Sequence, residues 1–372
     1  MSNTQKKNVP ELRFPEFEGE WEEKQLGNII KVNSGKDYKH LDKGDIPVYG
    51  TGGYMTSVSE PLSEIDAVGI GRKGTINKPY LLEAPFWTVD TLFYCTPKKE
   101  TDILFILSLF RKINWKVYDE STGVPSLSKQ TINKINRFVP TNKEQQKIGK
   151  FFSKLDRQIE LEEQKLELLQ QQKKGYMQKI FSQELRFKDE NGNDYPDWTN
   201  ERLGEVTTVT MGQSPKSVNY TDNSNDTVLI QGNGDIENGL INPRIYTREV
   251  TKLIQKDEII LTVRAPVGKL AMAQINACIG RGVCSIKGDK FLYYFLEWFA
   301  TQNKWIRFSQ GSTFESISGN DIRNIHIKIP VEDERTKIIK LLNSLDVLNS
   351  KTDLKIQNLK QRKQSLLQKI FV

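Results

Sequence analysis

The sequence is poor in cysteine and histidine, the residues that most often build disulfide frameworks, metal sites and catalytic centres. Cys95, Cys278 and Cys284 are odd in number and form no CxxC pair, so neither a disulfide framework nor a zinc site is expected. His40 and His326 have no Cys, Asp or Glu at metal-ligand spacing, and His326 lies in the alternating run IHIKIP, which is typical of a strand. The sequence therefore predicts no metal site and no catalytic residue.

Signals for membrane insertion, secretion and nucleotide chemistry are also missing. No apolar run has membrane length, and the first residues, MSNTQKKNVP, lack the apolar core of a signal peptide, so a cytoplasmic protein is expected. There is no GxxxxGK[ST] phosphate loop. The GxGxxG pattern of residues 69–74 is followed by Pro79, where a dinucleotide site needs a helix. NKPY at 77–80 differs from the NPPY tetrapeptide of adenine methyltransferases, and no S-adenosylmethionine loop precedes it. Catalysis by this chain alone is not expected.

Composition and length indicate a globular protein of more than one domain. The 372 residues allow two to three domains, and 37% hydrophobic residues are enough for sizeable cores. The net charge of +7 is modest, but 355–369 carries five basic residues and no acidic one. Such a distribution permits a polyanionic partner without requiring one.

Two stretches, 144–181 and 334–371, carry apolar residues at the alternating 3,4 spacing of a long helix. Corresponding members, such as Ile148 and Ile338, lie 190 residues apart, and both stretches end in QKIF. A stripe of about five heptads predicts a coiled-coil seam, and two copies favour pairing with each other. Some seam positions are polar, which weakens a coiled coil but fixes its register: Glu162, Lys173, Asn349, Thr352 and Lys363.

The entry to each copy is repeated as well. ELRF occurs at 11–14 and 184–187, and each copy continues to a tryptophan and a Leu-Gly pair. The chain stops at Val372, just where a third ELRF would begin, and the N-terminus supplies that piece. This circular phase predicts neighbouring termini, a pseudo-two-fold axis and two antiparallel helices with one globular domain at each end. The expected domains are 1–143, helix 144–183, 184–333 and helix 334–372.

Short strand-like runs and helices interleave in each globular part without a regular βαβ alternation, which indicates an α+β fold. In the first part we expect strands at 45–49, 67–70, 88–94 and 138–140 and a helix at 101–116. In the second we expect strands at 227–230, 258–263 and 271–275 and a helix at 290–308. The stretch 121–140 aligns with 311–330.

Loops in both parts mix glycine with hydroxyl, amide, aromatic and basic residues, the types that contact base edges and phosphates. The same residues also make ordinary turns. The candidate loops are 35–40, 49–54, 71–75 and 121–126, then 212–217, 231–234, 263–269, 280–282 and 310–314. The candidate DNA-binding residues are Lys36, Tyr38, Lys39, Tyr54, Arg72, Lys73, Lys216, Gln231, Asn233, Arg264, Lys269 and Arg281.

Four features together closely resemble the specificity subunit of type I restriction-modification systems. They are the entry ELRFPEFEGEW, the junctions VPTNKEQQKI (139–148) and IPVEDERTKI (329–338), the QKIF helices and the circular half-repeat. The resemblance implies two target recognition domains that each read one half of a split DNA site, with the helices setting the spacer. It also implies two docked methyltransferase subunits that methylate adenine using S-adenosylmethionine. In systems that cleave DNA, restriction subunits using ATP and Mg join them.

Two departures refine this expectation. The loop YGTGGY at 49–54 has no partner of equal length in the second part, which predicts an asymmetric target. The polar seam predicts that helix pairing leans on the docked subunits. Two other interpretations stay open: a stand-alone, repressor-like DNA-binding protein, and a coiled-coil adaptor with sugar- or protein-binding heads.

Overall fold

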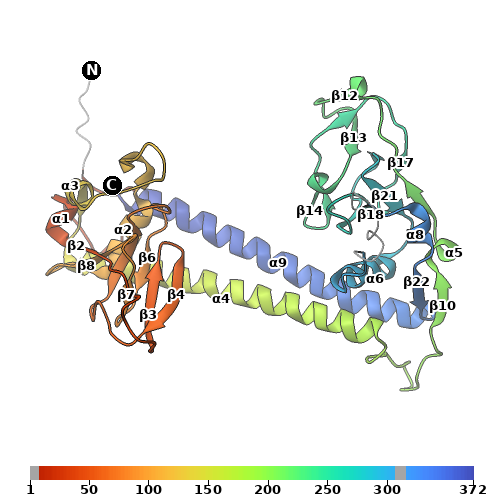
Figure 1. The fold of residues 1–372 in the computed structure, drawn as a ribbon, viewed down its shortest axis with the longest axis horizontal. Coiled ribbons are helices and arrows are strands. Elements are labelled where there is room, and N and C mark those ends of the chain that lie inside the picture. Colours follow the sequence, from red (N-terminus) through yellow and green to blue (C-terminus); the bar gives the residue numbers. More distant parts are fainter. Residues whose placement is uncertain (1–7, 306–315) are drawn as a thin grey trace. The chain divides into compact units, whose positions relative to one another are not determined.

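The computed structural model describes residues 8–305 and 316–372 (Figure 1). The chain divides into two compact units: unit 1 comprises Met1–Gln164 and Thr352–Val372, and unit 2 is Lys165–Lys351. Two long helices, α4 (Asn142–Phe181) and α9 (Glu332–Ile370), each give one part of their length to each unit. Among the described residues, no helix is long and apolar enough to cross a membrane.

Each unit contains a four-stranded sheet with the same strand order. In unit 1 the order is β2-β8-β5-β6, and in unit 2 it is β11-β21-β18-β19, with every neighbouring pair antiparallel. The bounds are β2 Ile30–Ser34, β8 Leu92–Pro97, β5 Ala67–Gly71 and β6 Tyr80–Leu82, then β11 Val209–Met211, β21 Val283–Ile286, β18 Ile259–Thr262 and β19 Leu270–Met272. The sequence repeat is therefore a repeat of topology, and the predicted α+β class is confirmed.

A second sheet in each unit contains one parallel pair. In unit 1, β3 (Ile46–Gly50) lies between β4 (Gly53–Val58) and the parallel strand β7 (Trp87–Thr88). In unit 2 the order is β12-β16-β13-β20-β17, and β13 pairs in parallel with β20. The bounds are β12 Tyr220–Thr221, β16 Tyr246–Thr247, β13 Thr227–Ile230, β20 Ala277–Ile279 and β17 Leu253–Ile254.

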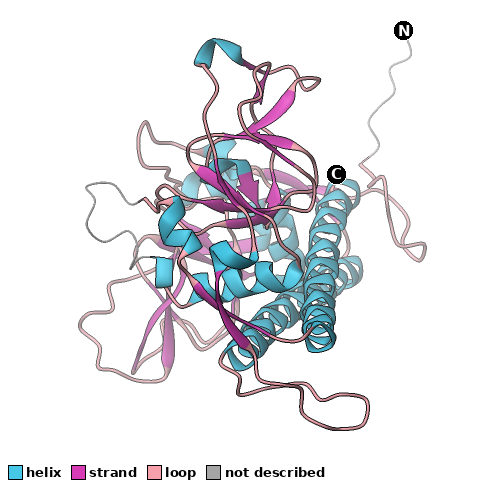
Figure 2. Cartoon of the chain, turned by 90° about the vertical axis from the view of Figure 1, so that its right-hand side faces the viewer, coloured by secondary structure: helices cyan, strands magenta, loops and turns pink. Residues whose placement is uncertain are grey.

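Smaller elements complete both units, as Figure 2 shows by secondary structure. Two-stranded pairs join β1 (Glu22–Gln25) to β9 (Asn136–Val139) and β10 (Thr199–Arg202) to β22 (His326–Ile329). A hairpin joins β14 (Ile236–Glu237) to β15 (Leu240–Ile241). The short helices are α1 Leu26–Ile29, η1 Trp115–Tyr118, α3 Lys129–Lys134, α5 Leu203–Val206, η2 Ser217–Asn219, η3 Asn233–Asp235 and α8 Gly319–Arg323.

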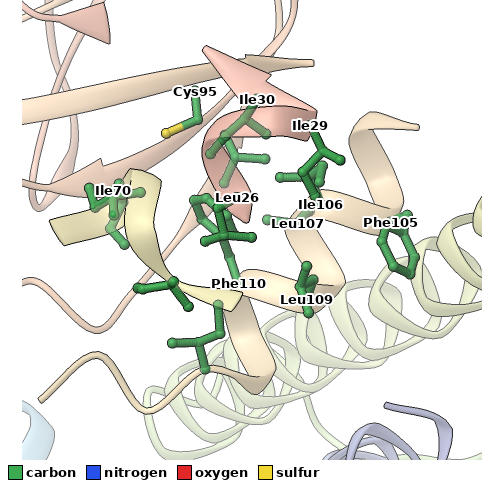
Figure 3. Close-up of a cluster of buried hydrophobic side chains, with 14 of the residues drawn as sticks. Leu26, Ile29, Ile30, Ile70, Cys95, Phe105, Ile106, Leu107, Leu109 and Phe110 are labelled. Atoms are coloured by element: carbon green, nitrogen blue, oxygen red, sulfur yellow. The ribbon is translucent and has the colours of Figure 1, made fainter. Parts of the chain in front are cut away.

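One amphipathic helix packs on the four-stranded sheet of each unit. In unit 1 this is α2 (Ile103–Lys112), which begins at an Asp102 cap that accepts from the N–H of Phe105 at 2.8 Å. Its buried face meets α1, β2, β5 and β8, as Figure 3 shows. In unit 2, α6 (Lys290–Thr301) begins at an Asp289 cap. The apolar face of each helix explains its burial on the sheet.

The predicted seam along α4 and α9 is confirmed by burial, because every one of its positions is buried or half-buried. In unit 1 the ammonium of Lys355 pairs with Glu162, and that of Lys363 pairs with Asp156. A higher residue number on α9 therefore meets a lower one on α4, so the two helices run antiparallel there, as predicted.

The polar seam residues Lys173, in unit 2, and Lys363, in unit 1, form the same type of ion pair. In unit 2, Lys173 is 8% exposed and its ammonium lies 2.7 Å from both Asp346 and Glu297. In unit 1, Lys363 pairs with Asp156, to which Arg111 of α2 also donates. Each lysine joins one long helix to an aspartate of the other, and the unit's amphipathic helix supplies another charged side chain. The lysines at these seam positions therefore pair the two long helices through charge instead of apolar contact.

Replacing Lys173 with methionine is expected to destabilise unit 2 by about 2 kcal/mol at neutral pH, because Glu297 and Asp346 lose their cation. The two acidic side chains keep about a third of their surface, which makes the cost smaller than for a sealed pair. Burial already raises the pKa of Glu297, which means that protonation favours the folded state. Urea unfolding should therefore show a smaller loss near pH 4.5, the ordinary pKa of a glutamate. Lys179→Met, at an exposed position of the same helix, is the control.

The circular phase of the repeat is visible in the backbone of both units. In unit 2 the N–H of Leu185, just after α4, donates to the carbonyl of Lys179 at 2.9 Å. In unit 1 the N–H of Leu12 donates to the carbonyl of Lys369, near the end of α9, also at 2.9 Å. The N-terminal segment that carries Leu12 thus bonds to the end of α9 as the segment that follows α4 bonds to the end of α4 in unit 2, as predicted.

Each entry motif is anchored by a buried glutamate at the start of a long helix. Glu144 is 1% exposed and accepts from Arg13 Nε at 2.8 Å and from Arg13 Nη2 at 2.7 Å, with Trp21 Nε1 at 3.3 Å. Glu334 is 0% exposed and binds Arg186 and Trp198 in the same way. These bonds explain why ELRF, the tryptophan and the junction glutamate recur together.

Some local predictions were wrong. The strand expected at 88–94 is two strands, β7 and β8, because a turn closes between them with Leu92 N–H donating to Val89 C=O at 3.0 Å. The helix expected at 101–116 ends at Lys112, and the separate turn η1 follows. The helix expected at 290–308 ends at Thr301, and the last part of that range lies outside the described residues.

Candidate nucleic-acid interface

The turn between β7 and β8 gathers the candidate loops of unit 1. The N–H of Lys36 donates to the carbonyl of Thr88, and the N–H of Arg72 donates to that of Thr91, both at 2.8 Å. The N–H of Val89 donates to Tyr49 C=O at 3.0 Å, which brings in the β3–β4 hairpin. The loop 121–126 joins through an isolated bridge between residues 73 and 126. Four loops that are distant in sequence therefore form one cluster.

The candidate side chains of unit 1 are mostly exposed at this cluster. Arg72 lies over the ring of Phe93 at 5.9 Å and donates to the carbonyl of Asp90 at 3.5 Å. Tyr54 is 64% exposed, with its ring edge-on to Tyr49 at 6.4 Å. Tyr38 is half-buried in the apolar cluster under the hairpin. Lys36, Lys39 and Lys73 are exposed.

In unit 2 four of the six candidates line one cleft of about 190 Å³. The cleft lies between the loop after β13, the loop after β18 and the turn between β20 and β21. Arg264 and Arg281 are exposed there, whereas Gln231 and Asn233 are half-buried. The complete lining is Ser214, Gln231, Gly232, Asn233, Arg264, Ala265, Arg281 and Gly282. Two guanidinium groups and two amides in a small cleft suit the edge of a nucleobase.

A buried carboxylate shapes the wall of this cleft. Asp235 is 3% exposed and accepts from the N–H of Gln231 at 2.8 Å and from that of Gly232 at 3.1 Å. Its other oxygen accepts from Arg244 at 3.0 Å. The loop that carries Gln231 and Asn233 is therefore held by one acidic side chain.

Changing Asp235 to asparagine is expected to weaken the binding of nucleic acid in this cleft about tenfold. The neutral amide loses charge-assisted hydrogen bonds worth roughly 1.5 kcal/mol, while the reading side chains stay. The preferred bases should therefore remain the same in a binding selection. Glu237→Gln, an exposed position two residues further along the chain, is the matched control. A change of base preference would contradict a purely positioning role for Asp235.

The remaining candidates of unit 2 lie beside the cleft. The ammonium of Lys269 donates to the carbonyls of Asn233 at 3.2 Å and Ile236 at 2.5 Å, so it supports the same loop from within. Lys216 is exposed, two residues after Ser214, and its backbone N–H donates to Glu249 at 3.0 Å. The candidate loop 310–314 lies outside the described residues.

The loop clusters of the two units share one backbone framework. Five backbone hydrogen bonds of unit 1 each have an equivalent in unit 2. In unit 1 the N–H groups donate to carbonyls from Gly35 to Leu92, Lys36 to Thr88, Val89 to Tyr49, Arg72 to Thr91 and Leu127 to Arg72. In the same order, the bonds of unit 2 run from Gly212 to Val283, Gln213 to Ile279, Gly280 to Ile230, Val263 to Gly282 and Ile317 to Val263. Isolated bridges join Lys73 to Ser126 and Arg264 to Ser316. The framework therefore makes Lys73 equivalent to Arg264. At the equivalent points of this framework the two units carry different side chains.

Sequence reasoning missed several residues of these clusters. Ser214 lies in the cleft, Asp235 and Arg244 hold its wall, and Asp90 sits in the turn of unit 1. Aspartates do not belong to the basic, amide, hydroxyl and aromatic types that mark a nucleic-acid contact in a sequence. The sequence did contain one signal for Asp235, since it follows the candidate loop QGNG directly.

The fold and the paired loop clusters define a protein with two like binding modules, each associated with part of two paired helices. A family model described as the type I restriction modification DNA specificity domain matches the chain twice, over residues 18–171 and 195–361. The chain therefore belongs to the family of type I restriction-modification specificity subunits, with one match of the family model in each half of the sequence. The resemblance noted from the entry and junction motifs is confirmed.

Similar proteins agree with this assignment. The putative type I restriction enzyme MjaX specificity subunit of Methanocaldococcus jannaschii is 30% identical over 261 residues, which cover 66% of this chain and 61% of that protein. The MjaVIII specificity subunit of the same organism is 26% identical over 77% of this chain and 71% of its own length.

Solved structures show the same fold. The S subunit of the type I restriction-modification system from M. genitalium matches 98% of this chain and 99% of its own, with a TM-score of 0.69 and 16% identity. A chain from a structural study of type I R-M complex assembly and conformational transition matches 94% of this chain and 97% of its own. Its TM-score is 0.56 and its identity 20%.

Proposed function

We propose that each unit of this chain reads one half of a split DNA target through its loop cluster. The observation that carries this proposal is the shared backbone framework, which presents different side chains in the two units. A constant frame with variable base-contacting residues suits two half-sites of different sequence. The target is therefore asymmetric, and the paired helices set the number of unread base pairs between its halves, as dimer geometry does in other DNA-binding proteins.

The chain acts in this proposal as the specificity-giving, non-catalytic subunit of a larger complex. Two methyltransferase subunits dock beside the helices and transfer methyl groups from S-adenosylmethionine to adenine. Restriction subunits that use ATP and Mg join where unmethylated DNA is cleaved. Membership of the specificity family supports these partners.

Genome-wide mapping of N6-methyladenine tests the proposal most directly. The chain would be co-expressed with a partner methyltransferase subunit, and the host genome sequenced by a single-molecule method. We expect a new split motif that disappears when the chain is omitted. The motif would give both half-sites and the spacer in one experiment.

Absence of any motif, with the proteins shown to co-purify, would overturn the proposal. Tight sequence-specific binding by the purified chain alone, without methylation in the complex, would instead favour a repressor-like protein. Indifference of the chain and the complex to DNA would favour an adaptor.

A further inference from the structure

One matched position in the two loop clusters carries opposite charges. The turn between the parallel-paired strand and the next strand is closed by Leu92 donating to Val89 in unit 1 and by Val283 donating to Gly280 in unit 2, at 3.0 and 3.2 Å. The residue that follows the accepting residue of this bond is Asp90 in unit 1, after Val89, and Arg281 in unit 2, after Gly280. These two side chains therefore leave equivalent points of one backbone framework.

Arg281 is positioned for a two-pronged contact. Its backbone N–H donates to the hydroxyl of Ser214 at 3.1 Å, and its Nε lies 3.4 Å from the same oxygen. This arrangement leaves the two terminal nitrogens of the guanidinium for a ligand. Within residues 8–305 and 316–372, Arg281 forms no ion pair, and no carboxylate lines the cleft that it shares with Gln231 and Asn233. A fork of two parallel donors matches the O6 and N7 acceptors of guanine.

Asp90 offers the complementary chemistry in unit 1. Its side chain is exposed, its carbonyl accepts from Arg72, and among the described residues its carboxylate enters no ion pair. Lys36 and Lys73 lie on neighbouring loops bonded to the same turn, and both bring positive charge. A carboxylate is repelled by phosphates, but it can accept a hydrogen bond from the N4 amino group of cytosine.

We propose that Asp90 and Arg281 are equivalent base-reading residues with opposite preferences: Arg281 selects guanine in the second half-site and Asp90 selects cytosine in the first. This inference rests on the proposed DNA-reading function and assigns bases to it. Exposed lysines on the neighbouring loops, such as Lys36 and Lys73, suit phosphate contacts.

The test uses Arg281→Gln and Asp90→Asn in the full-length chain, co-expressed with its modification subunits. Mapped methylation should show a motif changed at one position of the second half-site for Arg281→Gln, because glutamine pairs with adenine. Asp90→Asn should change one position of the first half-site. In a binding selection the preference for the original base should fall about 5- to 140-fold, the range of one good base contact.

Matched controls separate base reading from general damage. Arg248→Gln is the control in unit 2, because Arg248 lies outside the cleft. Asp45→Asn is the control in unit 1, because Asp45 precedes β3 at the end opposite to its turn. Both should leave the motif unchanged. Arg281→Lys keeps the charge but loses the fork, so it should lose discrimination while keeping the salt dependence of binding. The melting temperature of each variant shows that it is folded.

A motif unchanged by Arg281→Gln, with uniformly weaker binding and a smaller salt slope, would make Arg281 a phosphate contact and overturn the inference. A motif unchanged by Asp90→Asn would overturn the cytosine assignment. Either result leaves the proposed function intact, because the wild-type motif would still exist. Failure of the proposed function is distinct, since the wild-type chain would then give no motif.

Discussion

Replacing Glu334 with glutamine is expected to lower the free energy of unfolding of unit 2 by about 3 kcal/mol. Glu334 accepts two bonds from Arg186, one from Trp198 and one from the backbone N–H of Phe187. The bond to Glu334 raises the pKa of Arg186, and without it the ordinary pKa of an arginine is still far above neutral, so the guanidinium stays charged when the carboxylate is removed. A glutamine also turns its own NH2 group toward a donor, and the guanidinium, 22% exposed, keeps only the longer ion pair with Asp197 at 3.7 Å.

Hydrogen exchange in increasing urea distinguishes the two units. Protection should fall in β18 and β21 of unit 2 while β5 and β8 of unit 1 remain as in the unmodified chain. Glu332→Gln is the matched control, because this residue lies in the same helical turn and is exposed. Unchanged protection in β18 and β21 would show that the buried pair contributes little. Glu144→Gln should produce the reciprocal pattern in unit 1.

Replacing Gly212 with alanine is expected to weaken recognition of the second half-site roughly 100-fold, or about 3 kcal/mol. A Cβ at this position would lie 2.1 Å from the carbonyl oxygen of Gly280. The turn that carries Arg281 must therefore move away, because the obstacle is backbone. The equivalent Gly35 would meet the carbonyl of Val89 at 2.0 Å, so the constraint belongs to the framework.

Binding selections on each half-site separately check this result. Gly212→Ala should spare the first half-site and Gly35→Ala the second. Gly232→Ala is the control within the same cleft, since its Cβ would meet nothing within 4 Å and its backbone is extended, with φ at 174°. Equal losses from Gly212→Ala and Gly232→Ala would point to the cleft lining instead of the framework.

The sequence allowed most of the architecture to be predicted, because a repeat reports on itself. The 3,4 spacing indicated the long helices. The position of ELRF at the N-terminus and again after the first long helix indicated that the N-terminal segment follows the second helix in space. Short strand-like runs between turn residues indicated β5, β13 and β18. The pattern failed at 88–94, where Asp90 and Thr91 interrupt the apolar residues in a turn closed by Leu92 N–H donating to Val89 C=O.

The candidate site was less predictable. Residue type brought Gln231, Asn233, Arg264 and Arg281 to attention, and the structure places them in one cleft. Their equivalence with residues of unit 1 depends on backbone bonds between loops far apart in sequence, which periodicity cannot report. The role of Lys269 was hidden for the same reason: its ammonium lies against two carbonyls of another loop.

The division of the chain has a consequence for the order in which it folds during synthesis. Unit 2 is one continuous segment, Lys165–Lys351, so all of its core is synthesised before the last helix is finished. Unit 1 includes Leu367, Ile370 and Phe371 in the core that also contains Trp21 and Phe105. Domains generally fold from the N-terminus onward as they emerge. Here the core of unit 1 stays incomplete, with apolar surface exposed to solvent, until the last turn of α9 has been synthesised and packs against it.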